Sequence, residues 1–175
     1  TRNTIIPFLF DAAQKEYREA FASVDGIWSL LRDDPDRYIY PAIGHGIAWD
    51  VRKIPAQPLE RAYDLPAEIS VGIDDVSERG DWNLPAPEEH GLPTETWREV
   101  VARRQRHEEI RGKLTSGRVQ DINDLITLNL NISQFTEDVI IQSENPELLE
   151  AFWYILNNVS ILDPTCGSGA FLFSA

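Results

Sequence analysis

Residues 161–175 constrain the fold of this chain more than any other part of the sequence. They read Ile-Leu-Asp-Pro-Thr-Cys-Gly-Ser-Gly-Ala-Phe-Leu-Phe-Ser-Ala, an apolar run that ends in Asp163-Pro164, followed by Gly167, Gly169 and an apolar start to a helix. A strand, an acidic residue, a glycine turn and a helix in this order build the cradle for a nucleotide-like cofactor in doubly wound α/β folds. The sequence therefore predicts the beginning of such a fold.

The glycine spacing argues against the other common phosphate-binding loops. A G-x-G-x-x-G dinucleotide motif would place glycine at position 172, where this chain has Leu172. A Walker loop would need Lys and then Ser or Thr after the second glycine, where the chain has Ala170 and Phe171. Free N–H groups at a helix start favour a negative group, and Asp163 suits a cationic or hydroxyl partner. S-adenosylmethionine (SAM) offers a carboxylate, an ammonium and a ribose, so the pattern favours this cofactor.

The run Asp-Pro-Thr-Cys-Gly-Ser-Gly-Ala-Phe-Leu at 163–172 resembles the SAM-binding motif of amino-methylating DNA methyltransferases. It is most similar to large adenine-N6 methyltransferases of restriction-modification and phage-defence systems, the type IIG and PglX-like enzymes. Residues 121–158 also resemble the region that precedes the motif in those enzymes. The resemblance implies methyl transfer from SAM to adenine N6 in double-stranded DNA. Similar loops occur in RNA guanine-N2 and protein glutamine methyltransferases, which remain alternatives.

The resemblance also implies a role for each motif residue. Asp163 is expected near the ammonium of SAM, and Thr165, Gly167 and Gly169 along its methionine and ribose parts. Phe171 is expected beneath the loop or beside the cofactor. The implied cofactor-binding residues are thus Asp163, Pro164, Thr165, Gly167, Gly169 and Phe171.

A second motif of this family has the form Phe/Tyr-Thr-Pro, and the chain offers Phe135-Thr136 followed by Glu137 instead of proline. A core role for Phe135 in an amphipathic helix is the favoured interpretation. The family's catalytic Asn/Asp-Pro-Pro-Tyr/Phe motif, which holds a flipped adenine, is not found in the 175 residues. We therefore name no catalytic residue, and we expect this chain neither to methylate DNA nor to bind SAM well.

Composition indicates a folded, intracellular protein. The chain has no Met and starts with Thr, so we expect a processed product or a part of a longer protein, and the truncated cofactor motif favours the second. Its single cysteine, Cys166, fits a reducing cytoplasm, and no apolar run is long enough for a membrane span. His45 lies between two glycines without a second ligand at metal spacing, so a loop role is favoured and no metal is predicted.

The net charge of −13 is a poor match for DNA phosphates. One stretch, residues 98–118, is basic all the same, with seven Arg and Lys residues: Arg98, Arg103, Arg104, Arg106, Arg111, Lys113 and Arg118. One interpretation is that this helix contacts DNA phosphates. The favoured interpretation is a solvated helix with Glu–Arg pairs three and four residues apart. The chain is therefore not expected to be the main DNA-binding part.

Apolar periodicity and capping signals predict a mainly α protein. Helices are expected at 5–31 with a break at Asp25-Gly26, at 66–78, at 94–114, at 121–128, at 133–142 and at 146–157. Thr96 and Glu99 form a capping-box pair, Asn145 caps the last helix, and Trp82 anchors the loop at 80–93 by its burial. The last helix is expected to bury one face, made of Leu148, Leu149, Phe152, Ile155 and Leu156.

Two regions follow from this pattern. Residues 1–116 form a helical N-terminal or connector region, which we expect to act as an interaction module that docks on the rest of the enzyme. Residues 117–175 form the first part of a Rossmann-like methyltransferase domain, truncated after one strand and the glycine loop. The strand at 159–162 is expected to be unpaired or to pair with another chain, since a parallel partner needs a crossover of a dozen or more residues.

Overall fold

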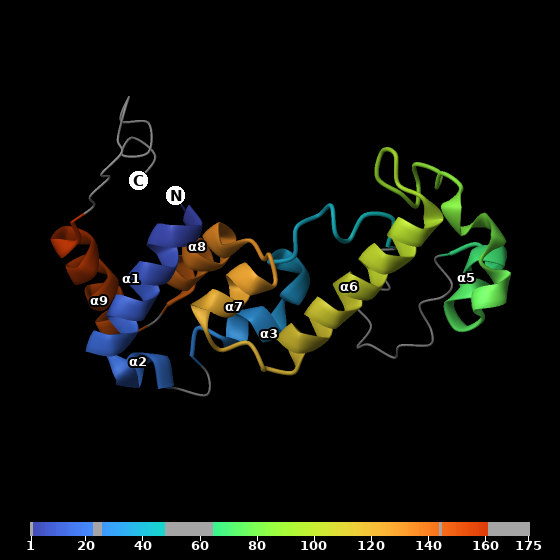
Figure 1. The fold of residues 1–175 in the computed structure, drawn as a ribbon. Helices are drawn as coiled ribbons and strands as arrows, with labels where there is room; N and C mark the ends of the chain where they lie inside the picture. Colours follow the sequence, from blue (N-terminus) through green and yellow to red (C-terminus); the bar gives the residue numbers. More distant parts are fainter. Residues whose placement is uncertain (1, 23–25, 48–64, 144, 161–175) are drawn as a thin grey trace, which may run out of the picture. The chain divides into compact units, whose positions relative to one another are not determined.

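The structure is a computed structural model that describes residues 2–22, 26–47, 65–143 and 145–160. Within these ranges the chain is helical, with only an isolated antiparallel bridge between Pro85 and Thr96 (Figure 1). The predicted mainly α class is confirmed. Of the predicted strand at 159–162, Val159 and Ser160 belong to no strand, and the other two residues lie outside the described part.

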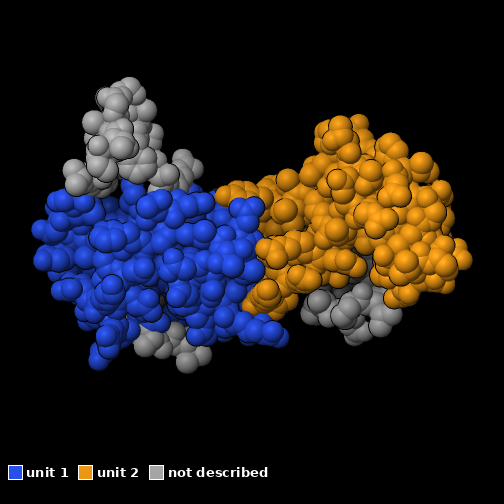
Figure 2. All heavy atoms as spheres, viewed as in Figure 1, with its two compact units in different colours: residues 1–38, 114–175 blue, residues 39–113 orange. Residues whose placement is uncertain are grey.

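The chain divides into two compact units, which Figure 2 shows in different colours. Unit 1 combines residues 1–38 with residues 114–175, and unit 2 comprises residues 39–113. Unit 1 is therefore built from both ends of the sequence, and unit 2 is inserted between them. The boundary predicted between residues 116 and 117 separates two regions of different function. The division into compact units does not test it, so it stays a prediction.

The N-terminal helices of unit 1 are shorter than predicted. Helix α1 spans Arg2–Glu16, α2 spans Arg18–Ala22, α3 spans Ser29–Asp33, and the 3-10 helix η1 spans Pro35–Arg37. The single helix predicted from residue 5 is thus interrupted at Tyr17, before the predicted break. The rings of Phe10 and Phe21 explain why, because their centroids are 6.5 Å apart. A straight helix would separate these residues by about 16 Å along its axis.

The C-terminal part of unit 1 contributes three helices close to their predicted positions. They are α7 at Ile122–Thr127, α8 at Ile132–Gln142 and α9 at Pro146–Asn158. Helix α1 packs against all three, and Figure 1 shows α9 lying beside it. Helix α1 is therefore the element on which the three C-terminal helices pack.

An aromatic cluster forms the core of unit 1. Phe10 meets Phe152 edge-to-face at a centroid distance of 4.9 Å, and it stacks on Phe135 at 6.0 Å. Phe135 also stacks on Trp28 at 5.5 Å and meets Tyr38 edge-on. Such pairs add about 0.5–1.5 kcal/mol each to the free energy gained by burial. The cluster joins α1, α8 and α9, so it stabilises the contact between the two ends of the sequence.

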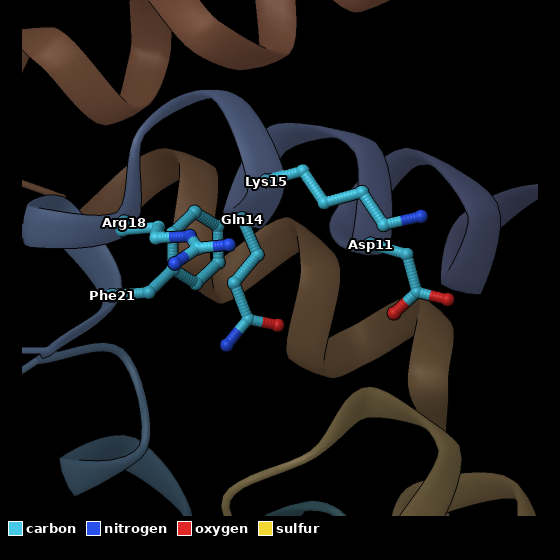
Figure 3. A pocket seen from close by; sticks show the side chains of 5 residues that line it. All are labelled: Asp11, Gln14, Lys15, Arg18 and Phe21. Carbon is cyan, nitrogen blue, oxygen red and sulfur yellow. The ribbon is translucent and has the colours of Figure 1, made fainter.

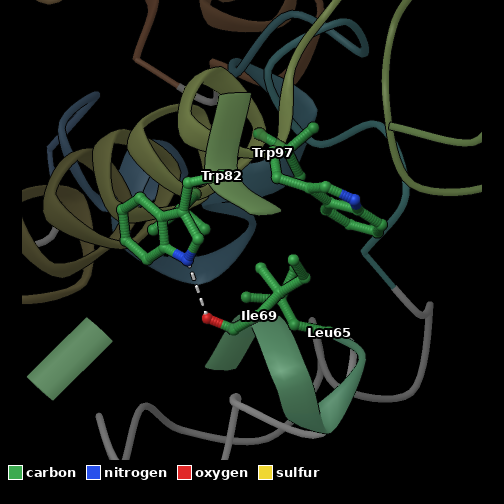
Figure 4. Close-up of a cluster of buried hydrophobic side chains, with 6 residues drawn as sticks. Leu65, Ile69, Trp82 and Trp97 are labelled. Atoms are coloured by element: carbon green, nitrogen blue, oxygen red, sulfur yellow. Dashed lines mark hydrogen bonds between the residues drawn. The ribbon is translucent and has the colours of Figure 1, made fainter. Parts of the chain in front are cut away.

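Unit 2 is built on α5 at Ala67–Asp74, the 3-10 helices η3 at Val76–Glu78 and η4 at Gly80–Asn83, and most of the long helix α6 at Trp97–Thr115, whose last two residues belong to unit 1. Its core consists of Leu65, Ile69, Trp82, Trp97, Val100 and Val101 (Figure 4). The indole N–H of Trp82 donates to the carbonyl of Ile69 at 3.1 Å. The predicted anchoring role of Trp82 is confirmed, since only 5% of the residue is exposed.

Both ends of α6 follow local signals. Glu99 accepts the backbone N–H of Thr96 at 2.7 Å and its hydroxyl at 2.8 Å, which confirms the predicted capping pair. These bonds hold the pKa of Glu99 below its usual value. The helix therefore starts at Trp97 instead of the predicted residue 94. Beyond its end, Gly117 takes a φ of +68° and donates to the carbonyl of Leu114.

Candidate functional site

The cofactor-binding residues that the sequence predicts lie outside the described part of the chain. They are Asp163, Pro164, Thr165, Gly167, Gly169 and Phe171. The described helix nearest to them in the sequence is α9, which ends at Asn158.

Helix α9 starts and ends at well-defined residues. The side-chain oxygen of Asn145 accepts the backbone N–H groups of Glu147 at 3.0 Å and Leu148 at 3.4 Å, which confirms the predicted cap, and Pro146 follows at the first helical position. At the other end, Val159 donates to the carbonyl of Ile155 and has an extended conformation, with φ −71° and ψ 135°. The chain thus leaves the helix extended, two residues before Ile161.

The buried face of α9 differs from the predicted one. Leu148, Ala151 and Phe152 are buried against the rest of unit 1, as steps of three and four residues require. Leu149 and Leu156, which were predicted to join them, are 36% and 51% exposed. They lie on another face, because positions 148 and 149 are about 100° apart around a helix. The sequence alone shows an apolar helix on several sides, and the packing on α1 selects one of them.

Phe135 is a core residue and not a ligand contact. It is fully buried in the aromatic cluster of unit 1, as the favoured interpretation predicted. Thr136, its neighbour, donates its hydroxyl to the carbonyl of Ile132 at 2.7 Å within α8. The Phe-Thr pair is therefore explained by helix packing.

An open groove of about 510 Å³ runs between α1 and α8. Its lining is mainly apolar: Ile6, Ser133, Thr136, Glu137, Ile140 and Ile141. The side chains of Ile140 and Ile141 are 45% and 71% exposed, so the groove is a surface feature. Apart from one carboxylate, its polar groups are two hydroxyls, which gives it no evident catalytic chemistry.

A second hollow of about 390 Å³ lies along α1 and α2 (Figure 3). Phe21 is buried there at 6% exposure, and the other lining side chains are Asp11, Gln14, Lys15 and Arg18. One carboxylate beside two cations on a helix surface is an ordinary solvated arrangement. We assign no site to this hollow.

Unit 1 contains a strong ion pair between distant segments. Arg37 donates to both carboxylate oxygens of Asp138, at 2.5 and 2.7 Å. Asp138 is 2% exposed and also accepts from Gln134 at 3.2 Å. The Arg37 bonds, with those from Tyr38 and Gln134, hold the pKa of Asp138 below its usual value despite its burial. Burial and the bond to Asp138 raise the pKa of Tyr38. These hydrogen bonds of Asp138 therefore connect α8 to η1.

The basic stretch of α6 is partly buried, which corrects the favoured prediction of a solvated helix. Arg103 is 9% and Arg104 is 7% exposed, and Arg111 is buried as well. Arg103 forms a two-pronged pair with Glu95, with N–O distances of 2.8 and 2.9 Å. This pair is the main reason why the pKa of Glu95 is lowered.

The same guanidinium also joins two loops of unit 2. It donates to the carbonyls of Ile43 at 3.2 Å, His45 at 2.7 Å and His90 at 3.0 Å. Arg104 donates to the carbonyl of Gly46 at 2.7 Å. These two arginines hold the loops of unit 2, so they are not available to contact phosphates.

His45 has the loop role that was favoured for it. It lies in a turn, and its Nε2 is 2.9 Å from the carbonyl of Glu88. No group of three or more His, Cys, Asp or Glu residues suited to a metal ion occurs in the described part of the chain. In the same ranges, no helix combines the length and apolar character that a bilayer crossing requires.

No family model matches the chain, and no curated protein and no solved structure matches it. An assignment of function therefore depends on the motif at 163–172 and on the properties of the described helices.

Proposed function

We propose that this chain provides the first wall of the SAM site of a DNA adenine-N6 methyltransferase of a restriction-modification or phage-defence system. The observation that carries the proposal is the run Asp163-Pro164-Thr165-Cys166-Gly167-Ser168-Gly169-Ala170-Phe171. SAM, when bound, would supply the methyl group.

The donor set fits the parts of this cofactor. The carboxylate of Asp163 suits an ammonium or ribose hydroxyl, and Gly167 and Gly169 let the backbone approach closely because they have no Cβ. The backbone N–H groups after Gly169 suit a carboxylate at a helix start. In the proposed site, Thr165 would add a hydroxyl, Pro164 would stiffen the turn, and Phe171 would provide an apolar surface. Methyl transfer needs a polar group for the adenine amino group, and no such motif occurs in these 175 residues.

Two described features support the proposal. Helix α9 ends at Asn158, and Val159 continues in an extended conformation, as a strand that leads to Asp163 would need. The net charge of −13 and the burial of Arg103 and Arg104 disfavour contacts between this chain and DNA phosphates. Double-stranded DNA would then contact other parts of the enzyme.

The test uses protein expressed from the complete reading frame that contains this chain. It is incubated with SAM carrying a labelled methyl group and, in parallel, with duplex DNA, transfer RNA and cell protein. We expect N6-methyladenine in the DNA by mass spectrometry. Label in guanine N2 of RNA, or in a glutamine of protein, would instead support the alternative substrates. Absence of transfer and of SAM binding would refute the proposal.

SAM binding to the protein from the complete reading frame is measured separately by calorimetry. Asp163→Ala should weaken SAM binding about tenfold, the loss of one charged hydrogen bond. The matched control is Asp33→Ala, because the side chain of Asp33 is 71% exposed and its removal changes the net charge equally. Equal affinities for the two variants would show that Asp163 does not contact the cofactor.

For residues 1–116 we propose a role as a helical interaction module. Within them, the apolar side chains of Val71, Val76 and Leu84 are 51%, 69% and 53% exposed and are accessible to a partner protein. Pull-down with the other parts of the enzyme at low and high salt, compared with duplex DNA, separates the two roles. Protein docking through apolar contacts should persist at high salt, whereas phosphate contact should be lost.

A further inference from the structure

The groove between α1 and α8, which we call the α8 groove, is lined by Ile6, Ser133, Thr136, Glu137, Ile140 and Ile141. The lining residues of α8 follow Ser133 by three, four, seven and eight positions, so they share one side of this helix. The other side is buried in unit 1 through Phe135 and Val139. Figure 1 shows α8 beside α1. Helix α8 is therefore held along one side and offers the other side to a partner.

The α8 groove combines an apolar surface with a negative charge. Ile140 and Ile141 are 45% and 71% exposed. Glu137 lies about one helical turn before them, roughly 5 Å along the axis. Within the described ranges, its carboxylate has no ion-pair partner and accepts only the side-chain N–H of Gln134, at a long 3.5 Å. This carboxylate is therefore available to a cation from outside.

The stretch that contains α7, α8 and α9 has no basic side chain. Residues 121–158 include no Lys, Arg or His, and their acidic residues are Asp121, Asp124, Glu137, Asp138, Glu144, Glu147 and Glu150. Asp138 is paired with Arg37, whereas Glu137, Glu147 and Glu150 are exposed. The groove thus belongs to a part of unit 1 whose charge attracts cationic molecules.

We propose that the α8 groove binds a basic amphipathic helix of a partner protein. An apolar side chain of that helix would pack on Ile140 and Ile141, and a Lys or Arg one turn along would pair with Glu137. A helix that lays its apolar side chains into a groove is a recurring mode of recognition. Charge complementarity with residues 121–158 would favour such a partner over an acidic one. The inference does not depend on the proposed SAM site, so the two can fail separately.

The same charges disfavour the other occupants. Phosphates of duplex DNA would be repelled by residues 121–158. A second copy would bring a net charge of −13 against them, and its basic helix α6 uses Arg103 and Arg104 to hold loops. A small molecule would remain largely in water, because sites for such ligands enclose most of the ligand and Ile141 is mainly exposed.

Fluorescence anisotropy with labelled synthetic peptides tests the proposal on the 175-residue chain. A basic peptide of about 18 residues, long enough to form a helix, carries Leu at steps of three and four and Lys elsewhere. An acidic peptide has Glu in place of each Lys. A third peptide has the composition of the first in an order that destroys the apolar face. We expect the basic amphipathic peptide to bind about tenfold more tightly than either of the others.

Variants with matched controls locate the binding. Ile141→Ser should weaken binding of the basic peptide about tenfold, because the burial of an exposed apolar side chain is lost. Leu156→Ser removes a 51% exposed apolar side chain outside the groove and should leave the affinity unchanged. Glu137→Gln should weaken binding about threefold at low salt and less at high salt. Glu150→Gln, which removes an equal charge from α9, should have a smaller effect.

Several results would overturn the proposal. They are equal binding of the basic and acidic peptides, an equal loss of affinity in Ile141→Ser and Leu156→Ser, and no binding of the basic peptide at about 1 mM. Self-association of the chain that Ile141→Ser abolishes, measured by sedimentation, would identify a second copy as the occupant. Binding of duplex DNA that the same substitution weakens would identify a nucleic acid instead.

Discussion

Arg37 and Asp138 are 101 positions apart in the sequence and form a two-pronged ion pair inside unit 1. The pair joins η1, near the start of the chain, to α8, near its end. In the same region the backbone N–H of Asn131 donates to the carbonyl of Tyr38 at 2.8 Å. Unit 1 therefore depends on contacts between two segments separated by all of unit 2. Such non-local pairing is formed late and slowly in folding, since a long loop must close first.

Replacement of Asp138 by Asn should lower the free energy of unfolding by about 2 kcal/mol at neutral pH, because a charged hydrogen-bond acceptor is lost in a buried place. Urea unfolding followed by circular dichroism measures this. The matched control is Glu137→Gln on the next, exposed residue, which should cost little. A loss of equal size in both variants would show that Asp138 acts only through general charge.

The same pair predicts a pH dependence. The pKa of Asp138 is lowered in the folded protein, so its contribution is fully present above the ordinary value of about 4 and is lost as the pH falls through the lower folded value. The difference in stability between the original chain and Asp138→Asn should therefore shrink below about pH 4. A difference that stays constant between neutral pH and about pH 3 would contradict this assignment.

Arg103→Lys should destabilise unit 2 by about 3 kcal/mol, because a lysine cannot keep the forked contacts to Glu95 and to three loop carbonyls. Denaturant unfolding monitored by tryptophan fluorescence reports on this unit through Trp82 and Trp97. Arg106→Lys, at an exposed position of the same helix, serves as the control. If both variants unfold at the same denaturant concentration, the loops do not depend on Arg103.

Two helical glycines should respond in opposite directions to alanine. At Gly72 a Cβ would lie 2.6 Å from Nε1 of Trp82, so Gly72→Ala should cost about 1–3 kcal/mol. At Gly112 a Cβ would meet nothing within 4 Å, so Gly112→Ala should stabilise by about 0.5–1 kcal/mol. Thermal unfolding of the two variants measures both effects. Stabilisation by Gly72→Ala would mean that Trp82 does not pack on α5 in this way.

Asn145→Ala should remove about 1 kcal/mol of stability, because the first N–H groups of α9 lose their acceptor. Asn145→Asp keeps an acceptor oxygen at the helix start, and it should retain most of the stability. Chemical denaturation compares the three proteins. An aspartate variant as weak as the alanine variant would argue against capping as the role of this residue.

The sequence was sufficient wherever the controlling interaction is local. Thr96 with Glu99, Asn145 with Pro146, and Gly117 each involve residues within a few positions of a helix end, so the starts and ends of α6 and α9 were predicted within about three residues. The helix predicted at 66–78 ends at Asp74, four residues earlier than predicted. The interruption at Tyr17 was missed, because it depends on the ring of Phe21 reaching Phe10 and Phe152. No signal within the helix marks that contact.

By itself, the sequence determined the mainly helical class and the helix caps, and it contains the glycine motif at 163–171 on which the proposed SAM site depends. Only the tertiary structure decided which apolar side chains of α9 are buried, and that Arg103 and Arg104 hold loops instead of facing solvent. The physical reason is range. Caps and tight turns are set by neighbours along the chain, whereas burial and ion pairing are set by segments that meet only when the chain has folded.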